Sequence, residues 1–100
     1  MLKVLAKCDS KLRKSILQKA SSSLLRSLCE CSLNVLKGNV KLTSTQKKKL
    51  SRHRHKLRTL ADRKVSNKRK KQLMIQQGGF LGALLTPVLS TLAGLLFKRL

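Results

Sequence analysis

The charge of the stretch KKKLSRHRHKLRTLADRKVSNKRKK (Lys47–Lys71) limits how this chain can fold. It holds thirteen basic residues against one acid, Asp62, a local charge of about +12. Like charges at this density repel one another unless a polyanion neutralises them. The few apolar residues that interrupt the stretch are Leu50, Leu57, Leu60, Ala61 and Val65. Since these bury little surface, we predict that the stretch binds a nucleic-acid backbone and that the rest of the chain supports this surface.

The predicted phosphate-binding residues are the Lys and Arg of this stretch: Lys47, Lys48, Lys49, Arg52, Arg54, Lys56, Arg58, Arg63, Lys64, Lys68, Arg69, Lys70 and Lys71. Single-stranded RNA is usually held by stacking on aromatic rings, and the stretch contains none. Asn67 is its only Asn or Gln, so base-specific readout is not expected. The predicted partner is therefore double-stranded DNA, bound through phosphates without sequence specificity.

The composition of the whole chain limits the size of its core. The chain has 100 residues, a formal net charge of +21 and two aromatic residues, Phe80 and Phe97. A core without many aromatics must be built of Leu, Val, Ile and Ala, and it will be thin. We predict an all-α fold of several short, loosely packed helices, with a basic central helix and an apolar C-terminal helix. The predicted regions are an N-terminal helical region (1–42), basic nucleic-acid-binding helices (43–77) and an apolar tail (78–100).

The N-terminal region has helical spacing of its apolar residues over Leu2–Lys19 and over Leu24–Lys37. Asp9 or Ser10 has the chemistry of a helix cap, which predicts a second helical piece within the first segment. Gly38 follows the second segment directly, which is typical of a left-handed C-cap.

The basic region has a specific helix start. Thr43 and Gln46 match a capping box, in which each side chain accepts the backbone N–H of the other residue. We predict one basic helix from about residue 44 to residue 62 or 64. Ser66 is the predicted cap of a shorter basic helix, Asn67–Gln76, which the glycine pair after it is expected to end.

The tail sequence FLGALLTPVLSTLAGLLF (Phe80–Phe97) carries no charge. As a helix it spans about 27 Å, slightly less than a bilayer core. Pro87 predicts a bend or break. Small residues every fourth position allow close helix approach in lipid, and Lys98-Arg99 favours an anionic surface. We predict contact with a membrane, with capsid proteins or with another copy, and leave core packing as an alternative. The residues predicted for membrane contact or self-association are Phe80, Leu81, Gly82, Leu85, Thr86, Val88, Leu89, Ser90, Leu92, Gly94 and Leu96.

Metal binding and catalysis are not expected. Residues two apart on a helix point roughly 200° apart, so neither Cys29 and Cys31 nor His53 and His55 can share an ion. We interpret Cys31 as a core residue and the two histidines as part of the basic face. Three acids in the chain are too few for general acid–base or Mg²⁺ chemistry. The prediction is a non-enzymatic protein with no cofactor and no small-molecule substrate.

The order of these parts resembles a known family. A Lys/Arg-dense block followed by GGFL (Gly78–Leu81), by Ala83-Leu84-Leu85 and by Pro87 is similar to the adenoviral late core protein X family, the precursors of the mu peptide. Small proteins of Polinton/Maverick-type elements and adintoviruses resemble the chain over a longer range, Leu24–Leu96. That range includes the helical stretch CECSLNVLKGN (Cys29–Asn39).

The resemblance implies a virion core protein that condenses double-stranded DNA, located in the virion core and the host nucleus, with a membrane-active or cleavable tail. The adenoviral protease prefers an aliphatic residue two positions before its glycine pair, and this chain has Gln76 there. Two other interpretations remain open: a cationic membrane-active or small membrane protein, and a ribosome-associated basic protein. Duplex binding by a chain that ends at Gln77 would favour the DNA-condensing core protein over these two.

Overall fold

The computed structural model describes the backbone of residues 2–99 and the side chains of residues 2–90. Within that range the chain is all helical and has no strand, so the predicted all-α class is confirmed. The elements are α1 (Leu2–Lys7), α2 (Ser10–Gln18), α3 (Ser22–Leu36), α4 (Ser44–Ser51), α5 (Arg54–Ala61), α6 (Asn67–Gln77), the 3₁₀ turn η1 (Gly78–Phe80) and α7 (Leu81–Arg99).

The helix starts follow the capping signals in the sequence. The predicted capping box is present: the Thr43 N–H donates to Gln46 Oε1 at 2.9 Å, and the Gln46 N–H donates to Thr43 Oγ1 at 3.2 Å. Asp9 caps α2 and Ser66 caps α6, each accepting the backbone N–H three residues on. Gly38 has φ of +79°, the left-handed conformation predicted after α3. These starts were predictable because a cap is a local interaction.

The predicted single basic helix is wrong in one respect, because it is interrupted at Arg52-His53. The first half, α4, packs against α7, whereas α5 packs against α3. The break lets the two halves pack on different helices while Leu50 and Leu57 both stay buried. The second half ends at Ala61, slightly before the predicted end, and Asp62 Oδ1 accepts the Lys64 N–H at 2.9 Å in the turn that follows.

The glycine pair and Pro87 also act differently from the prediction. Helix α6 ends at Gln77, but η1 carries the chain directly into α7, so the glycines redirect the helical path and do not stop it. Helix α7 continues through Pro87 without a break. Pro87 is fully buried. We attribute the unbroken helix to this packing, which compensates for the hydrogen bond that proline cannot donate.

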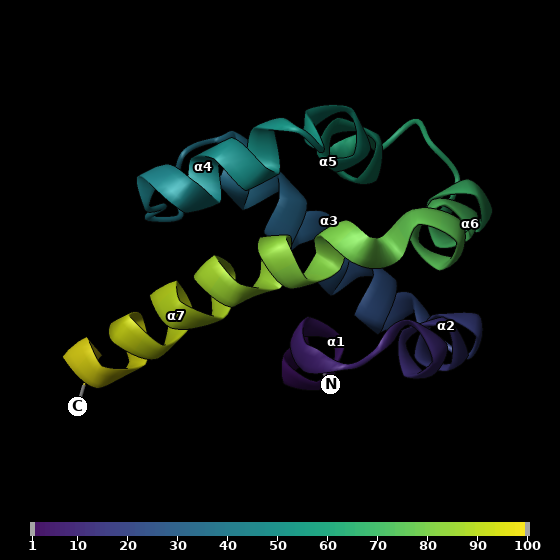
Figure 1. The fold of residues 1–100 in the computed structure, drawn as a ribbon, viewed down its shortest axis with the longest axis horizontal. Helices are drawn as coiled ribbons and strands as arrows, with labels where there is room; N and C mark the ends of the chain where they lie inside the picture. Colours follow the sequence, from purple (N-terminus) through teal and green to yellow (C-terminus); the bar gives the residue numbers. More distant parts are fainter. Residues whose placement is uncertain (1, 100) are drawn as a thin grey trace.

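Helix α7 crosses the middle of the molecule with α3 beside it (Figure 1). Helices α4 and α5 lie along one long edge, α1 and α2 lie along the other, and α6 closes one end (Figure 1). Both α1 and α4 pack on α7, and α2 packs on α6. The radius of gyration is 13.0 Å, about the value expected for a compact domain of 100 residues. The three predicted regions therefore form one globule.

All three regions contribute to one core. Its buried apolar residues are Leu5, Leu17, Leu25, Leu28, Cys31, Val40, Leu50, Leu57, Leu60, Met74, Phe80, Leu81, Leu84, Leu85 and Val88. The predicted role of Cys31 as a core residue is confirmed. The tail supplies five of these residues, which makes the first half of α7 the centre of the globule.

This placement corrects part of the predicted membrane surface. Four of the predicted residues are at most 6% exposed: Phe80, Leu81, Leu85 and Val88. In this fold they are not accessible to lipid or to a second copy. Of the other predicted residues, Gly82 and Leu89 are half-buried and Thr86 and Ser90 are exposed. Leu92, Gly94 and Leu96 continue α7, and their side chains lie outside the described residues.

By length and composition alone, the helical stretch Asn67–Ser90 is long and apolar enough to cross a membrane. However, 44% of its most apolar window is buried inside the fold, and core helices pass the same criterion. We conclude that this stretch works in the described fold as a core element.

Candidate nucleic-acid interface

Most of the predicted phosphate-binding side chains are accessible. Lys56 and Lys71 are half-buried and Lys70 is buried, while the remaining ten are exposed. The exposed ten are Lys47, Lys48, Lys49, Arg52, Arg54, Arg58, Arg63, Lys64, Lys68 and Arg69. They extend from α4 through α5 to α6, along one long edge and around one end of the molecule (Figure 1).

The cations face outward because the few leucines between them face inward. Leu50 in α4 is 4% exposed, and Leu57 and Leu60 in α5 are 2% and 0% exposed. A short helix with one or two buried leucines leaves most of its surface to Lys and Arg. The sparse apolar residues of the basic stretch thus anchor its helices to the core. Their number in the sequence did not predict this role.

Few carboxylates compensate this charge. The chain has three acids against 24 Lys and Arg. Asp9 Oδ1 accepts the Leu12 N–H at 2.8 Å, and Asp62 Oδ1 accepts the Lys64 N–H at 2.9 Å. Two of the three carboxylates therefore stabilise backbone turns. The arrangement leaves a cationic edge that an external polyanion can neutralise.

His53 does not join the basic face as predicted, although His55 is exposed there. The His53 ring lies at the break between α4 and α5, 5.9 Å from the Phe80 ring between centroids. Lys56 Nζ lies 5.6 Å from the centroid of the same ring and 3.4 Å from His53 Nδ1. A lysine ammonium only donates, so Nδ1 is the acceptor and His53 is neutral in this contact. Burial, then Lys56 and Arg52, lowers the pKa of His53.

This cluster predicts a loss of stability in acid. Because the fold lowers the pKa of His53, the unfolded chain takes up its proton more readily than the folded chain. The stabilisation is complete above the unfolded value of about 6.5 and is lost as the pH falls below it. We expect His53→Gln to flatten the pH dependence of the urea-unfolding free energy. Equal pH dependence in His53→Gln and the parent chain would contradict the assignment.

Lys70 is a correction to the predicted interface. It is 5% exposed and lines a cavity of about 400 Å³ between α3, α5 and α6, together with Glu30, Arg26 and Asn67. No feature of the run KRKK distinguishes Lys70 from its neighbours, because its burial depends on how α6 packs. A lysine whose side chain is 5% exposed has little surface to offer a phosphate, because its stem is covered by the wall of this cavity.

The two neighbouring lysines provide a matched comparison. We expect Lys70→Met to raise the melting temperature slightly and to change duplex affinity little, because an apolar side chain suits a position that is 5% exposed and no phosphate contact is lost. Lys68→Met should leave stability unchanged and reduce the salt slope of duplex binding by about one. Thermal melts and binding to a short fluorescent duplex measure both effects. A loss of duplex affinity from Lys70→Met as large as that from Lys68→Met would show that Lys70 contacts phosphate.

The cysteines and histidines do not converge. Among the described residues, no group of three or more His, Cys, Asp or Glu could hold a metal ion. Cys8, Cys29 and Cys31 are free thiols, and burial, reinforced by Glu30 and Cys29, raises the pKa of the Cys31 thiol.

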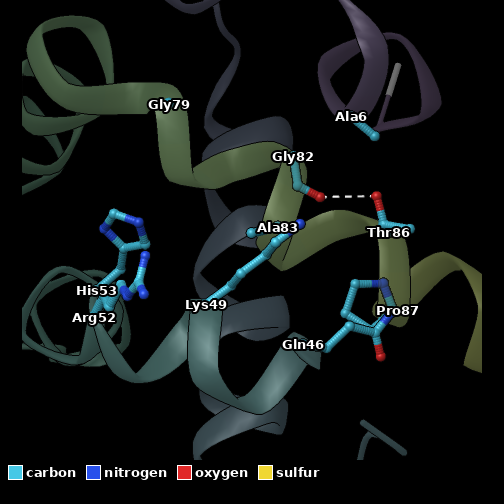
Figure 2. Close-up of a pocket in the computed structure, with 10 residues that line it drawn as sticks. All are labelled: Ala6, Gln46, Lys49, Arg52, His53, Gly79, Gly82, Ala83, Thr86 and Pro87. Carbon is cyan, nitrogen blue, oxygen red and sulfur yellow. Dashed lines mark hydrogen bonds between the residues drawn. The ribbon is translucent and has the colours of Figure 1, made fainter. Parts of the chain in front are cut away.

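A cavity of about 470 Å³ lies between α1, α4 and α7 (Figure 2). Lys49, Arg52 and His53 line its α4 side. At its other side Gly82 lets α1 approach α7 closely, since a Cβ there would lie 3.2 Å from the Ala6 carbonyl oxygen. Gly82, one of the small residues that recur at every fourth position of the tail, therefore serves helix packing within the globule.

Comparisons of the chain with protein-family models, with curated proteins and with solved structures give no match.

Proposed function

We propose that this chain is a non-enzymatic protein that binds and condenses double-stranded DNA through phosphate contacts. The observation that carries the proposal is the run of ten exposed Lys and Arg from α4 to α6, with Asp62, its one acid, engaged by the backbone. A cationic surface of this kind binds duplexes through the release of condensed counterions and needs no base contacts.

The net charge of the chain nearly equals the phosphate charge of a duplex over the length of the molecule. A duplex carries about one phosphate charge per 1.7 Å of axis, so the 36 Å long axis of the molecule spans about 21 charges. The formal net charge is +21. One molecule per turn of duplex DNA therefore brings a protein–DNA mixture to charge equivalence, and neutralised duplexes no longer repel one another.

The resemblance of the basic block and the GGFL junction to adenoviral core protein X supports a location in a virion core and the host nucleus. We propose this context for the chain, in an element of the Polinton/Maverick or adintovirus type. Cleavage between Gly79 and Phe80 would require opening of the fold, because Phe80 is 1% exposed. We therefore propose that the intact, folded chain is the DNA-binding form.

Binding to duplex DNA, single-stranded DNA, anionic vesicles and ribosomal RNA tests the proposal. We expect the full chain to bind a short duplex DNA at low salt, and to bind it at least as tightly as single-stranded DNA of equal charge. Long duplex DNA should collapse, as measured by light scattering, near charge equivalence. Anionic vesicles in place of the duplex would test the membrane alternative, and structured ribosomal RNA would test the ribosomal one. Preferential binding to vesicles or to ribosomal RNA, with weak duplex binding, would overturn the proposal.

A further inference from the structure

A second set of cations lies away from the basic stretch. Helices α1 and α2, together with the C-terminal cap residue of α2, carry five exposed lysines: Lys3, Lys7, Lys11, Lys14 and the cap residue Lys19. The one acid beside them, Asp9, is engaged in capping α2. Arg13 belongs to the same helix but is half-buried, and a Cβ on Gly78 would lie 3.0 Å from its Nε. The five lysines, and not Arg13, form what we name the α1–α2 edge.

The α1–α2 edge lies on the opposite side of the molecule from α4 and α5, whereas α6, the last part of the basic stretch, packs on α2. Figure 1 shows α1 and α2 along one long side and α4 and α5 along the other, with α3 and α7 between them. The core holds this separation, because Leu5 of α1 and Leu17 of α2 are 1% and 0% exposed. The core therefore holds the α1–α2 lysines on a different side of the molecule from the cations of α4 and α5.

One straight duplex that lies along α4 and α5 cannot also lie along the α1–α2 edge. The body is 25 Å across its shorter axes, and a duplex is nearly straight over this distance because its persistence length is about 50 nm. The Debye length at physiological salt is about 8 Å, so a duplex on one edge leaves the charge of the other largely uncompensated. That residual charge attracts a second polyanion.

We propose that the α1–α2 edge binds a second duplex, so that one monomer bridges two DNA molecules. This inference rests on the proposed function and explains how a monomer would condense DNA: the α4–α5 side holds one duplex and the α1–α2 edge holds the next. Five phosphate contacts give a salt slope of about −4.5, half of the value for ten contacts. Bridging should therefore fail at a lower salt concentration than the binding of a single duplex.

Two variants with equal charge test the proposal. In the first, the five lysines of the α1–α2 edge are replaced by Gln. In the second, five exposed cations of the basic stretch, all on α4 and α5, are replaced by Gln: Lys47, Lys48, Lys49, Arg54 and Arg58. Each variant lowers the formal net charge by five. A third variant, with Arg at the five α1–α2 lysines, retains the charge. Circular dichroism melts check that all three fold.

Two readouts separate binding from bridging. Anisotropy of a short duplex reports single-duplex binding, and recruitment of a free labelled duplex to bead-bound duplex reports bridging. We expect the α1–α2 Gln variant to lose bridging at least tenfold while its single-duplex affinity changes less than threefold. The basic-stretch variant should lose both, and the Arg variant should keep both. Equal losses of single-duplex affinity in both Gln variants, or unchanged bridging in the α1–α2 Gln variant, would overturn the inference. If the parent chain binds no duplex, the proposed function itself fails, which is a different result.

Discussion

A chain that ends at Gln77 is expected to lose its fold. The truncation removes Phe80, Leu81, Leu84, Leu85 and Val88, five side chains that are at most 6% exposed. Shortening one buried leucine to alanine typically costs about 2–5 kcal/mol, and whole domains are stable by only about 5–15 kcal/mol. The combined loss exceeds the stability of a small domain. Far-UV circular dichroism and thermal melting should show reduced helix content and no cooperative transition.

Two point variants in α7 give the matched comparison. Leu84→Ala, at a position that is 0% exposed, should lower the free energy of unfolding by about 2–5 kcal/mol. Ser90→Ala, at an exposed position of the same helix, should change it by less than about 0.5 kcal/mol. A cooperative melt in the chain ending at Gln77 would show instead that the tail is dispensable for folding. In that case the membrane interpretation of the tail would regain its basis.

The expected unfolding also changes how the tail can be tested. Loss of DNA binding after truncation at Gln77 would not distinguish a binding role of the tail from a folding role. Substitutions at exposed positions such as Thr86 and Ser90 avoid this difficulty. They alter the accessible surface of the tail while Leu84 and Leu85 keep the core intact.

The features that could be predicted from the sequence are those with local causes. The Thr43–Gln46 capping box, the Ser66 cap and the left-handed Gly38 each depend on residues within one turn, and all three are present. The exposure of most of the basic stretch also follows from composition, since helices with so few apolar residues have little to bury.

The features that were predicted wrongly depend on tertiary packing. An uncharged segment such as Phe80–Phe97 suits a bilayer and a protein core equally, and the burial of its first half depends on α1, α3 and α4 surrounding α7. Lys70 and His53 are turned inward by the way α6 and the α4–α5 break sit on the core. No spacing rule within the basic stretch separates these two residues from their exposed neighbours.

The affinity for duplex DNA is expected to depend steeply on salt. If the ten exposed cations from α4 to α6 supply about six to ten phosphate contacts, the binding constant falls by about 10³–10⁵ between about 50 and 200 mM salt. Each contact contributes about −0.9 to the slope of log affinity against log salt. The slope therefore counts the cations that touch phosphate, independently of the absolute affinity.

Single substitutions make this count specific to positions. Replacement of an exposed cation of α4 or α5, such as Lys48→Gln or Arg58→Gln, should reduce the slope by about 0.9. Val40→Ala, which alters a buried apolar residue, should change stability without changing the slope. The measurement is fluorescence anisotropy on a short duplex over a series of salt concentrations. A slope shallower than about −3 for the parent chain would mean about three phosphate contacts. The exposed cations of the basic stretch would then be mostly solvated, and phosphate binding would not account for their number.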